Sequence, residues 1–362
     1  MNMPRLLLAA GGTGGHMFPA QALAEILKSD GWDIAMMTDA RGRKHSGNIP
    51  ADPIIDVEAA TVNPKRPIKA VTGLWRLSRG VRQAKKFTRD WKPDVIVGFG
   101  GYPAFPAMRA AQSLKIPSLI HEQNAVLGRV NRVFATRARV VASGFDDLEK
   151  LPAGANHVPI GNPLRAQIVD AIPEAYEAPT GIINLVIIGG SLGARLISDV
   201  VPRAVADLPE DLRKRLHVVQ QTREESLSVA RMTYEGAYVP NICEPFFSDI
   251  QKHLASAHFI IGRAGASSVS EIAAMGKPSL LVPLAIAMDD HQTANANSLK
   301  SLGAADILPE SEFTPEKVKS ILEARLSDSN WLENAARSAK SAARTDAAKA
   351  MAKLVKAAIQ NA

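Results

Sequence analysis

Three glycine-rich segments each follow a short apolar run, an arrangement in which the backbone can bind a phosphate. They are residues 11–16 (GGTGGH), 98–102 (GFGGY) and 189–194 (GGSLGA). Glycine lets the backbone approach a ligand, and a helix that begins after such a turn offers free N–H groups and a partial positive charge. One loop of this kind can arise for steric reasons alone, whereas three favour a nucleotide-type ligand.

The common nucleotide motifs do not describe these loops. Counted from Gly12, the third glycine of a GxGxxG fingerprint would fall at Met17. Asp39 could still imitate the acid that binds a ribose in that motif, so an NAD enzyme is disfavoured rather than excluded. The sequence contains no GxxxxGK[ST], which excludes the P-loop NTPases.

Two ionisable residues stand where an acid–base step could take place. His16 closes the first loop, and an imidazole with a near-neutral pKa can take a proton from a hydroxyl. Glu122 ends an apolar run, the position at which doubly wound folds bind ligands. Glu122 is the rival base, and His16 could instead only hydrogen-bond its loop or a diphosphate. The identity of the base therefore stays open.

Alternating strands and helices must position these loops. Helical stretches separate strand-like apolar runs at residues 5–10, 33–38, 94–99, 117–122, 139–143, 183–188, 215–220, 258–262 and 278–283. This alternation predicts the α/β class with parallel, doubly wound sheets. The order of strand, glycine turn and helix restarts at Ile183, which predicts two Rossmann-like domains.

The length of 362 residues also favours two domains. Residues 151–180 are rich in Pro and Gly, as interdomain connections are. We place the boundary at Arg165, which gives domains at residues 1–165 and 166–340. The Ala- and Lys-rich tail from Trp331 has helical periodicity, and residues 341–362 are predicted to be a closing helix.

Composition limits the compartment and the class of protein. A lone Cys243 cannot form an intramolecular disulfide, which fits a reducing cytoplasm. The apolar run at the N-terminus is too short for a signal peptide, and no run reaches the roughly 18 apolar residues of a spanning helix. We therefore expect a protein without transmembrane helices.

The net charge of +7 is concentrated in one segment. Residues 1–170 hold 23 Lys/Arg against 14 Asp/Glu, a net of +9, and residues 65–92 hold ten basic residues against the single acid Asp90. Apolar residues alternate with these basic ones, as in a basic amphipathic helix. The segment could be an ordinary surface helix or a membrane-binding helix. Nucleic acid is less favoured, because no recognisable nucleic-acid module accompanies it.

Seven motifs occur in the order found in the MurG family of glycosyltransferases, which the chain resembles over most of its length. They are residues 11–20 (GGTGGHMFPA), 100–106 (GGYPAFP), 121–132 (HEQNAVLGRVNR), 161–165 (GNPLR), 189–195 (GGSLGAR), 263–283 (RAGASSVSEIAAMGKPSLLVP) and 289–296 (DDHQTANA). The resemblance implies a glycosyltransferase-B fold whose N-terminal domain binds the acceptor and whose C-terminal domain binds the donor.

The resemblance also implies a reaction. N-acetylglucosamine would pass, with inversion, from UDP-N-acetylglucosamine to the 4-hydroxyl of undecaprenyl-diphospho-N-acetylmuramoyl-pentapeptide, converting lipid I to lipid II in peptidoglycan synthesis. No cofactor and no metal are expected, because no DxD motif or His/Cys cluster is present. The paired acids 146–147 and 289–290 are interpreted as solvated or capping residues. With a lipid-linked acceptor, the basic helix would bind anionic lipid, so the enzyme would lie peripherally on the cytoplasmic face of the inner membrane.

Residue roles follow from the same resemblance. The catalytic candidates are His16 and Glu122. The donor-binding residues are Thr13, Gly14, Gly15, Asn124, Arg165, Ser191, Phe247, Glu271 and Gln292. The acceptor-binding residues are Gly100, Gly101, Tyr102 and His121, and the membrane-binding residues are Trp75, Arg76, Arg79, Arg82 and Lys86.

Within the donor set, Ser191 would bind the diphosphate, the backbone around Phe247 the uracil, Glu271 the ribose and Gln292 the sugar. The chain departs from the family pattern at Leu192, Ser198 and His291, which weakens the residue assignments for the donor sugar.

Two other functions remain open. A UDP-N-acetylglucosamine epimerase resembles this fold and uses the same nucleotide sugar, but it would need carboxylates crowding the donor and no lipid acceptor. In a non-catalytic nucleotide-sugar-binding protein, His16 and Glu122 would have no chemical task.

Overall fold

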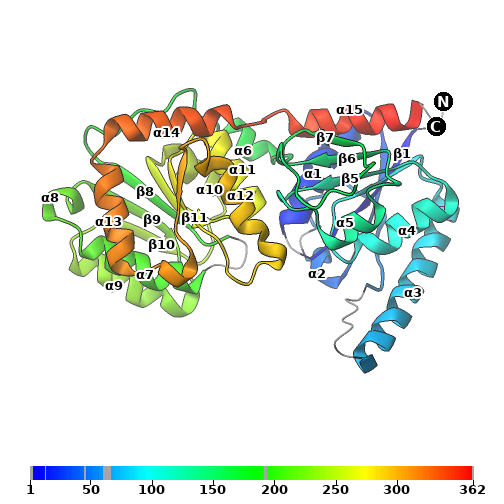
Figure 1. Ribbon diagram of the computed structural model, residues 1–362, viewed down its shortest axis with the longest axis horizontal. Coiled ribbons are helices and arrows are strands. Elements are labelled where there is room, and N and C mark those ends of the chain that lie inside the picture. The colour runs from blue at the N-terminus through cyan, green and yellow to red at the C-terminus, as the bar shows by residue number, and fades with distance from the viewer. Residues whose placement is uncertain (1–2, 13, 45, 60–66, 191–193, 361–362) are drawn as a thin grey trace. The chain divides into compact units, whose positions relative to one another are not determined.

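The computed structural model describes residues 3–12, 14–44, 46–59, 67–190 and 194–360, without the side chains of residues 67–71 (Figure 1). The chain forms two compact units. The first combines Met1–Arg165 with Arg344–Ala362, and the second is Ala166–Ala343.

The first unit is built on a parallel sheet with the strand order β3-β2-β1-β4-β5-β6-β7. The strands are β1 (Arg5–Ala9), β2 (Asp33–Thr38), β3 (Ile54–Asp56), β4 (Val95–Gly98), β5 (Ser118–Glu122), β6 (Val140–Ser143) and β7 (His157–Pro159). The helices are α1 (Gly14–Ser29), α2 (Ala40–Arg43), α3 (Pro67–Trp91), α4 (Ala104–Leu114), α5 (Arg129–Phe134) and α15 (Ala347–Gln360).

Helices cover both faces of this sheet, which explains why its central strands are apolar throughout. Side chains of a strand alternate between the faces. Leu6 and Leu8 of β1 join the core cluster that contains residues of α1 and α15. Leu7 and Ala9 join the opposite cluster, which contains residues of α4.

The C-terminal helix α15 belongs to the first unit and packs against α1 (Figure 1). Its approach depends on Gly161. The φ of Gly161 is +88°, and a Cβ there would lie 2.5 Å from the Cβ of Arg344. Arg344 also forms an ion pair with Asp146. These contacts join the residues that precede α15 to the end of the first unit's sheet.

The second unit is a parallel sheet with the order β10-β9-β8-β11-β12-β13. The strands are β8 (Ile183–Ile188), β9 (Leu216–Gln221), β10 (Asn241–Glu244), β11 (Phe259–Arg263), β12 (Ser279–Val282) and β13 (Ala305–Ile307). The α-helices are α6 (Ala166–Asp170), α7 (Arg195–Ala206), α8 (Glu210–Arg213), α9 (Leu227–Gly236), α10 (Ile250–Ser256), α11 (Ala266–Met275), α12 (His291–Lys300), α13 (Pro315–Leu326) and α14 (Ser329–Ser341). Three short 3₁₀ segments also occur among the described residues: η1 (Glu224–Ser226), η2 (Met288–Asp290) and η3 (Glu310–Glu312).

The predicted class of two doubly wound α/β domains is confirmed. The sequence pattern missed β3, β7, β10 and β13, which are the outermost strands of the two sheets. These strands are short and partly exposed. An edge strand has a neighbour on one side only, so it need not be an unbroken apolar run.

Two helix boundaries also differ from the sequence pattern. The spacing of apolar residues typical of a helix starts at Pro19 in the sequence, but the helix itself begins at Gly14. The helical periodicity from Trp331 belongs to two helices, α14 and α15, with residues 342–346 between them, and the closing helix predicted at residues 341–362 is α15.

Candidate functional site

The carboxyl ends of three neighbouring strands form the candidate site of the first unit. The order β1-β4-β5 places the loop after β1, the loop after β4 and Glu122 of β5 side by side. These are the first glycine loop, the second glycine loop and the rival base. Ligands of doubly wound sheets bind at this edge.

The structure brings His16 to the second loop. His16 is partly exposed in the first turn of α1. The φ of Gly100 is +86°, and a Cβ on it would lie 3.3 Å from Cδ2 of His16 and 3.2 Å from Nδ2 of Asn131. Gly100 therefore allows the His16 ring to lie against the backbone of the second loop, close to Asn131.

Glu122 is 3% exposed, and its carboxylate accepts four hydrogen bonds. Oε1 accepts from the backbone N and the Nδ2 of Asn124, both at 3.1 Å. Oε2 accepts from the backbone N of Gly128 and from Nδ2 of Asn131, both at 2.8 Å. A carboxylate has about four lone-pair positions. Glu122 thus uses its acceptor capacity to fix the loop that leads into α5.

The side chain of His121 is buried inside the first unit. Its ring is fully buried, with Nε2 3.1 Å from the carbonyl oxygen of Gly161 and Nδ1 3.1 Å from Nε2 of Gln123. Only the tautomer with hydrogen on Nε2 satisfies both contacts, because that nitrogen meets a carbonyl. Burial lowers the pKa of His121 to about 4. Both ring nitrogens of His121 have partners inside the first unit, and the expected contact between His121 and the acceptor stays a prediction.

Asp39 supports the first loop from the neighbouring strand. Its Oδ1 accepts the N–H of Gly42 at 2.9 Å, which caps α2, and the N–H of Gly12 at 3.3 Å. Both contacts of Oδ1 are to the protein backbone, and Oδ2 accepts from Nε of Arg41 at 3.3 Å. Asp39 is thus a capping residue that fixes Gly12, and its likeness to a ribose-binding acid has no structural counterpart here.

The remaining predicted residues of the first unit lie around the same edge. Tyr102 and Gly101 are partly exposed, and a Cβ on Gly101 would lie 3.1 Å from the carbonyl oxygen of Gly11. Arg165 stacks its guanidinium 4.3 Å from the ring centroid of Phe18 on α1. Gly14 and Gly15 begin α1. Thr13 lies outside the described residues.

In the second unit, the loop after β8 carries the third glycine motif. The Gly189 N–H donates to Oε1 of Gln221 at 3.1 Å. Ser191 and Leu192 lie outside the described residues, so the predicted contact of Ser191 stays a prediction.

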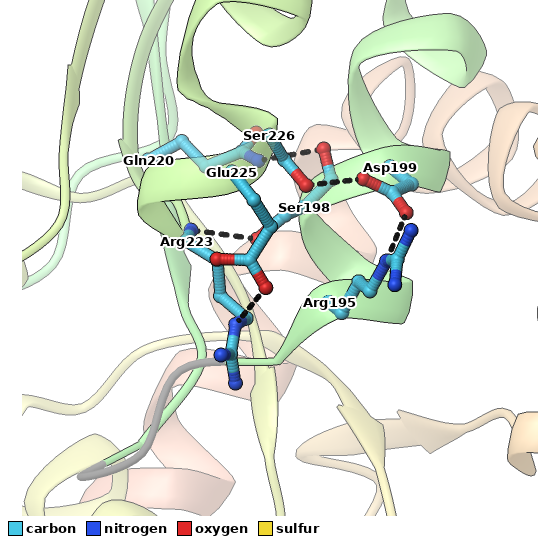
Figure 2. A network of polar contacts seen from close by, with 7 residues as sticks. All are labelled: Arg195, Ser198, Asp199, Gln220, Arg223, Glu225 and Ser226. Atoms are coloured by element: carbon cyan, nitrogen blue, oxygen red, sulfur yellow. Dashed lines mark hydrogen bonds and ion pairs between the residues drawn. The ribbon is translucent and has the colours of Figure 1, made fainter.

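Beyond that loop, α7 is bonded to the segment after β9 (Figure 2). Ser198 Oγ accepts the Arg223 N–H at 3.1 Å, and Ser226 Oγ donates to Asp199 Oδ1 at 2.5 Å. Arg195 pairs with Asp199 at 3.5 Å. Ser198, one of the departures from the family pattern, thus holds α7 in place through its hydroxyl.

The carboxyl ends of β11 and β12 form the rest of the second unit's edge. Arg263, 9% exposed, donates to Glu310 Oε1 at 2.5 Å and to the Val282 carbonyl at 3.3 Å. Glu310 Oε2 accepts the N–H of Ala285 at 2.8 Å. This partly buried ion pair joins the end of β11 to the loop after β12.

Glu271 and Gln292 lie on the helices that follow these strands, α11 and α12. Both side chains are partly exposed. Gln292 Oε1 accepts the Leu284 N–H at 3.0 Å, and Nδ2 of the buried Asn295 donates to the Ala264 carbonyl at 3.1 Å. Gln292 therefore also holds the loop after β12.

The aromatic residue singled out after β10 is the buried one of a pair. Phe247 is 7% exposed and packs edge-on against His253, with ring centroids 5.0 Å apart. The neighbouring Phe246 is 73% exposed. No sequence signal separates two adjacent phenylalanines, because the choice depends on the turn after Glu244. The side chain that can contact a ligand here is that of Phe246.

The basic segment forms α3, which packs on α4 (Figure 1). Phe87 and Trp91 pack against the core with their rings stacked 5.9 Å apart. Leu74 and Trp75 are 60% and 58% exposed. The apolar residues of this helix thus divide: Phe87 and Trp91 pack inward as in an ordinary surface helix, and Trp75 is exposed. Arg76, Arg79, Arg82 and Lys86 are all exposed.

Within the described part of the chain, no helix is both long and apolar enough to cross a membrane. Among the same residues, no group of three or more His, Cys, Asp or Glu side chains could hold a metal ion. The paired acids have local partners: Asp146 binds Arg344, and Asp290 Oδ1 accepts from Thr293 Oγ1 at 2.8 Å at the start of α12.

Family models match both halves of the chain. Residues 6–143 match the glycosyltransferase family 28 N-terminal domain, and residues 184–351 match the glycosyltransferase family 28 C-terminal domain. The chain belongs to glycosyltransferase family 28.

Close relatives carry a single name, UDP-N-acetylglucosamine–N-acetylmuramyl-(pentapeptide) pyrophosphoryl-undecaprenol N-acetylglucosamine transferase. The relative from Maricaulis maris is 52% identical over 98% of each chain. That from Mesorhizobium japonicum is 42% identical over 97% of this chain and 94% of its own.

Solved structures agree with the family. Acinetobacter baumannii MurG superposes with a TM-score of 0.81 at 30% identity, over 98% of this chain and 100% of its own. A UDP-N-acetylglucosamine 2-epimerase from Listeria monocytogenes has a TM-score of 0.67 at 14% identity, over 100% of this chain and 98% of its own, a likeness that shows the fold alone.

Proposed function

We propose that this protein is an inverting transferase that moves N-acetylglucosamine from UDP-N-acetylglucosamine to the 4-hydroxyl of the lipid-linked muramyl pentapeptide. The observation that carries the proposal is 52% identity, over nearly the whole chain, to a relative named for this transfer. The loop edges of both units retain side chains suited to it.

His16 is the proposed general base. It is partly exposed and lies against Gly100 of the second loop, in the unit that the resemblance assigns to the acceptor. Glu122 is instead a positioning residue, because its four hydrogen bonds hold Asn124 and Asn131. A base needs a lone pair directed at the substrate, and the lone pairs of Glu122 are directed at N–H donors of its own unit.

The second unit would bind the donor. The third glycine loop precedes α7, whose first N–H groups suit a diphosphate that gains charge as the leaving group departs. Glu271 would bind the ribose and Gln292 the sugar. The backbone after Pro245 would bind uracil, and the exposed ring of Phe246 adjoins it.

Incubation of the full chain with labelled UDP-N-acetylglucosamine and a lipid-linked muramyl acceptor tests the proposal directly. We expect a disaccharide product and free UDP, with the same yield in EDTA. Formation of UDP-N-acetylmannosamine without acceptor would instead identify an epimerase. Binding of UDP with neither product would leave a nucleotide-sugar-binding protein.

We also propose that α3 attaches the enzyme to the anionic, cytoplasmic face of the inner membrane. Four exposed basic residues, Arg76, Arg79, Arg82 and Lys86, lie on the same helix as the exposed Leu74 and Trp75. The Arg79 guanidinium lies 5.5 Å from the Trp75 ring centroid, so a charge and an apolar group share one surface. Each basic residue near an anionic surface contributes about 1 kcal/mol, and shallow apolar insertion adds to this.

Vesicle co-sedimentation tests this attachment. Replacing Arg76, Arg79, Arg82 and Lys86 by Gln should reduce binding to anionic vesicles at least tenfold and leave UDP affinity unchanged. A matched control replaces four exposed basic residues of the second unit, Arg203, Lys214, Lys252 and Lys300. Equal binding of the α3 variant and the control variant, or no preference for anionic over neutral vesicles, would contradict the proposal.

A further inference from the structure

Gln221, the last residue of β9, hydrogen-bonds two segments that are distant in the sequence. Its Oε1 accepts the N–H of Gly189 at 3.1 Å, and its Nε2 donates to the carbonyl oxygen of Pro245 at 3.3 Å. Gly189 follows β8, and Pro245 follows β10. One side chain therefore bridges the loops on either side of its own strand.

The two partners fix the orientation of the amide. A backbone N–H can only donate and a carbonyl can only accept, so a flipped amide would lose both contacts. The main chain supports the same geometry, because Glu244 pairs with Gln221 in the sheet and the Thr222 N–H donates to the Glu244 carbonyl at 2.9 Å. Pro245 is thus held within reach of the amide.

The two segments that Gln221 bridges are the ones proposed to bind the two ends of UDP. Gly189 begins the loop proposed for the diphosphate. Pro245 begins the segment proposed for uracil, where Phe246 is exposed and Phe247 is anchored in the core. A hydrogen bond to a peptide group fixes the plane of that peptide and so the direction of the chain beside it.

We propose that Gln221 is a positioning residue that couples the diphosphate loop to the base-binding segment, so that preference for uracil depends on this bridge. The inference rests on the proposed function, because it takes the donor nucleotide to be UDP. Gln221 does not need to touch the nucleotide. Its effect should appear in donor affinity and base selectivity, and not in the chemical step.

Two variants remove different parts of the bridge. Gln221→Met keeps a similar length and loses both hydrogen bonds. Gln221→Glu can still accept from Gly189 but cannot donate to Pro245. Because UDP and CDP carry the same diphosphate, the ratio of their affinities cancels the effect of the added charge. Gln112→Met, at a partly buried glutamine bonded to Arg137 in the first unit, is the matched control.

Calorimetric titration with UDP and CDP gives the decisive ratio. We expect Gln221→Met to weaken UDP binding about tenfold, and both Gln221 variants to lower the preference for UDP over CDP about threefold or more. The KM for the donor should rise, with kcat at saturating donor within about twofold of wild type. The control should match wild type.

The outcomes separate this inference from the proposed function. The inference alone is overturned if the wild-type chain binds UDP and either Gln221 variant, melting at the wild-type temperature, keeps the wild-type ratio of UDP affinity to CDP affinity. A wild-type chain that does not bind UDP overturns both. A Gln221→Met variant that fails to fold is replaced in this comparison by Gln221→Glu, whose retained bond to Gly189 preserves the loop.

Discussion

The loop edges of the two units are supported in different ways. In the first unit, Glu122 bonds groups at most nine residues further along the chain. In the second unit, Gln221 reaches back 32 residues to Gly189, and Arg263 reaches forward 47 residues to Glu310. Glu122 lies inside the motif that it supports, residues 121–132, whereas Gln221 lies outside all seven motifs. A motif in the first unit therefore includes a residue whose side chain supports the loop itself.

Among the variants that test this comparison, His16→Ala should have the largest effect, a loss of turnover. His16 is proposed to act on the acceptor itself, and loss of a general base lowers turnover about 10² to 10⁴-fold. Turnover with saturating acceptor measures the catalytic role of His16, and calorimetry with UDP measures any role in donor binding. Near-normal turnover would remove the catalytic role, and weakened UDP binding would move His16 to the donor.

Glu122→Gln should act mainly on the stability of the first unit. One side of an amide cannot accept, so two of the four N–H donors lose their partner, at a cost of about 3 kcal/mol in the free energy of unfolding. Urea unfolding in a Trp331→Phe background follows the first unit, because the other tryptophans are Trp32, Trp75 and Trp91. Unchanged stability with turnover reduced at least 10²-fold would instead restore Glu122 as the base.

The buried His121 makes the first unit sensitive to mild acid. Its pKa is about 4 in the folded chain against 6.5 when unfolded, so the unfolded chain binds more protons between these values. The free energy of unfolding should then rise with pH across this range, and about 2 kcal/mol should be lost between pH 7 and pH 5. His121→Gln should flatten this slope in the same Trp331→Phe background. An equal slope in both proteins would contradict the prediction.

The smallest expected effect concerns a direct contact in the second unit. Glu271→Ala should weaken UDP binding by about 1 to 2 kcal/mol, because ribose hydroxyls lose a charged acceptor. Binding of 2′-deoxy-UDP should weaken less, since one of those hydroxyls is already absent. Equal losses for the two nucleotides would show that Glu271 acts on another part of the donor, and loss of UDP binding in EDTA would show a metal dependence that the proposal lacks.

Much of the candidate site follows from the sequence, because short-range pattern sets where strands end and loops begin. The apolar runs locate the central strands, and the glycine motifs locate the loops after β1, β4 and β8. The resemblance then supplies the family and the reaction. Edge strands escape the pattern, because partial exposure removes the apolar run that marks a strand.

The direction of individual side chains was decided only by the tertiary structure. The resemblance assigns both His16 and His121 to the site, and only the structure shows that His121 is buried and His16 partly exposed. Phe246 and Phe247 are adjacent in the sequence, yet Phe246 is exposed and Phe247 is buried. Gln221 had no local signal at all, because its partners are brought to it by strand pairing. The sequence by itself determined the α/β class and the order of the loops, since both depend on local periodicity. The supports of those loops depend on which strands become neighbours, and that is a property of the folded chain.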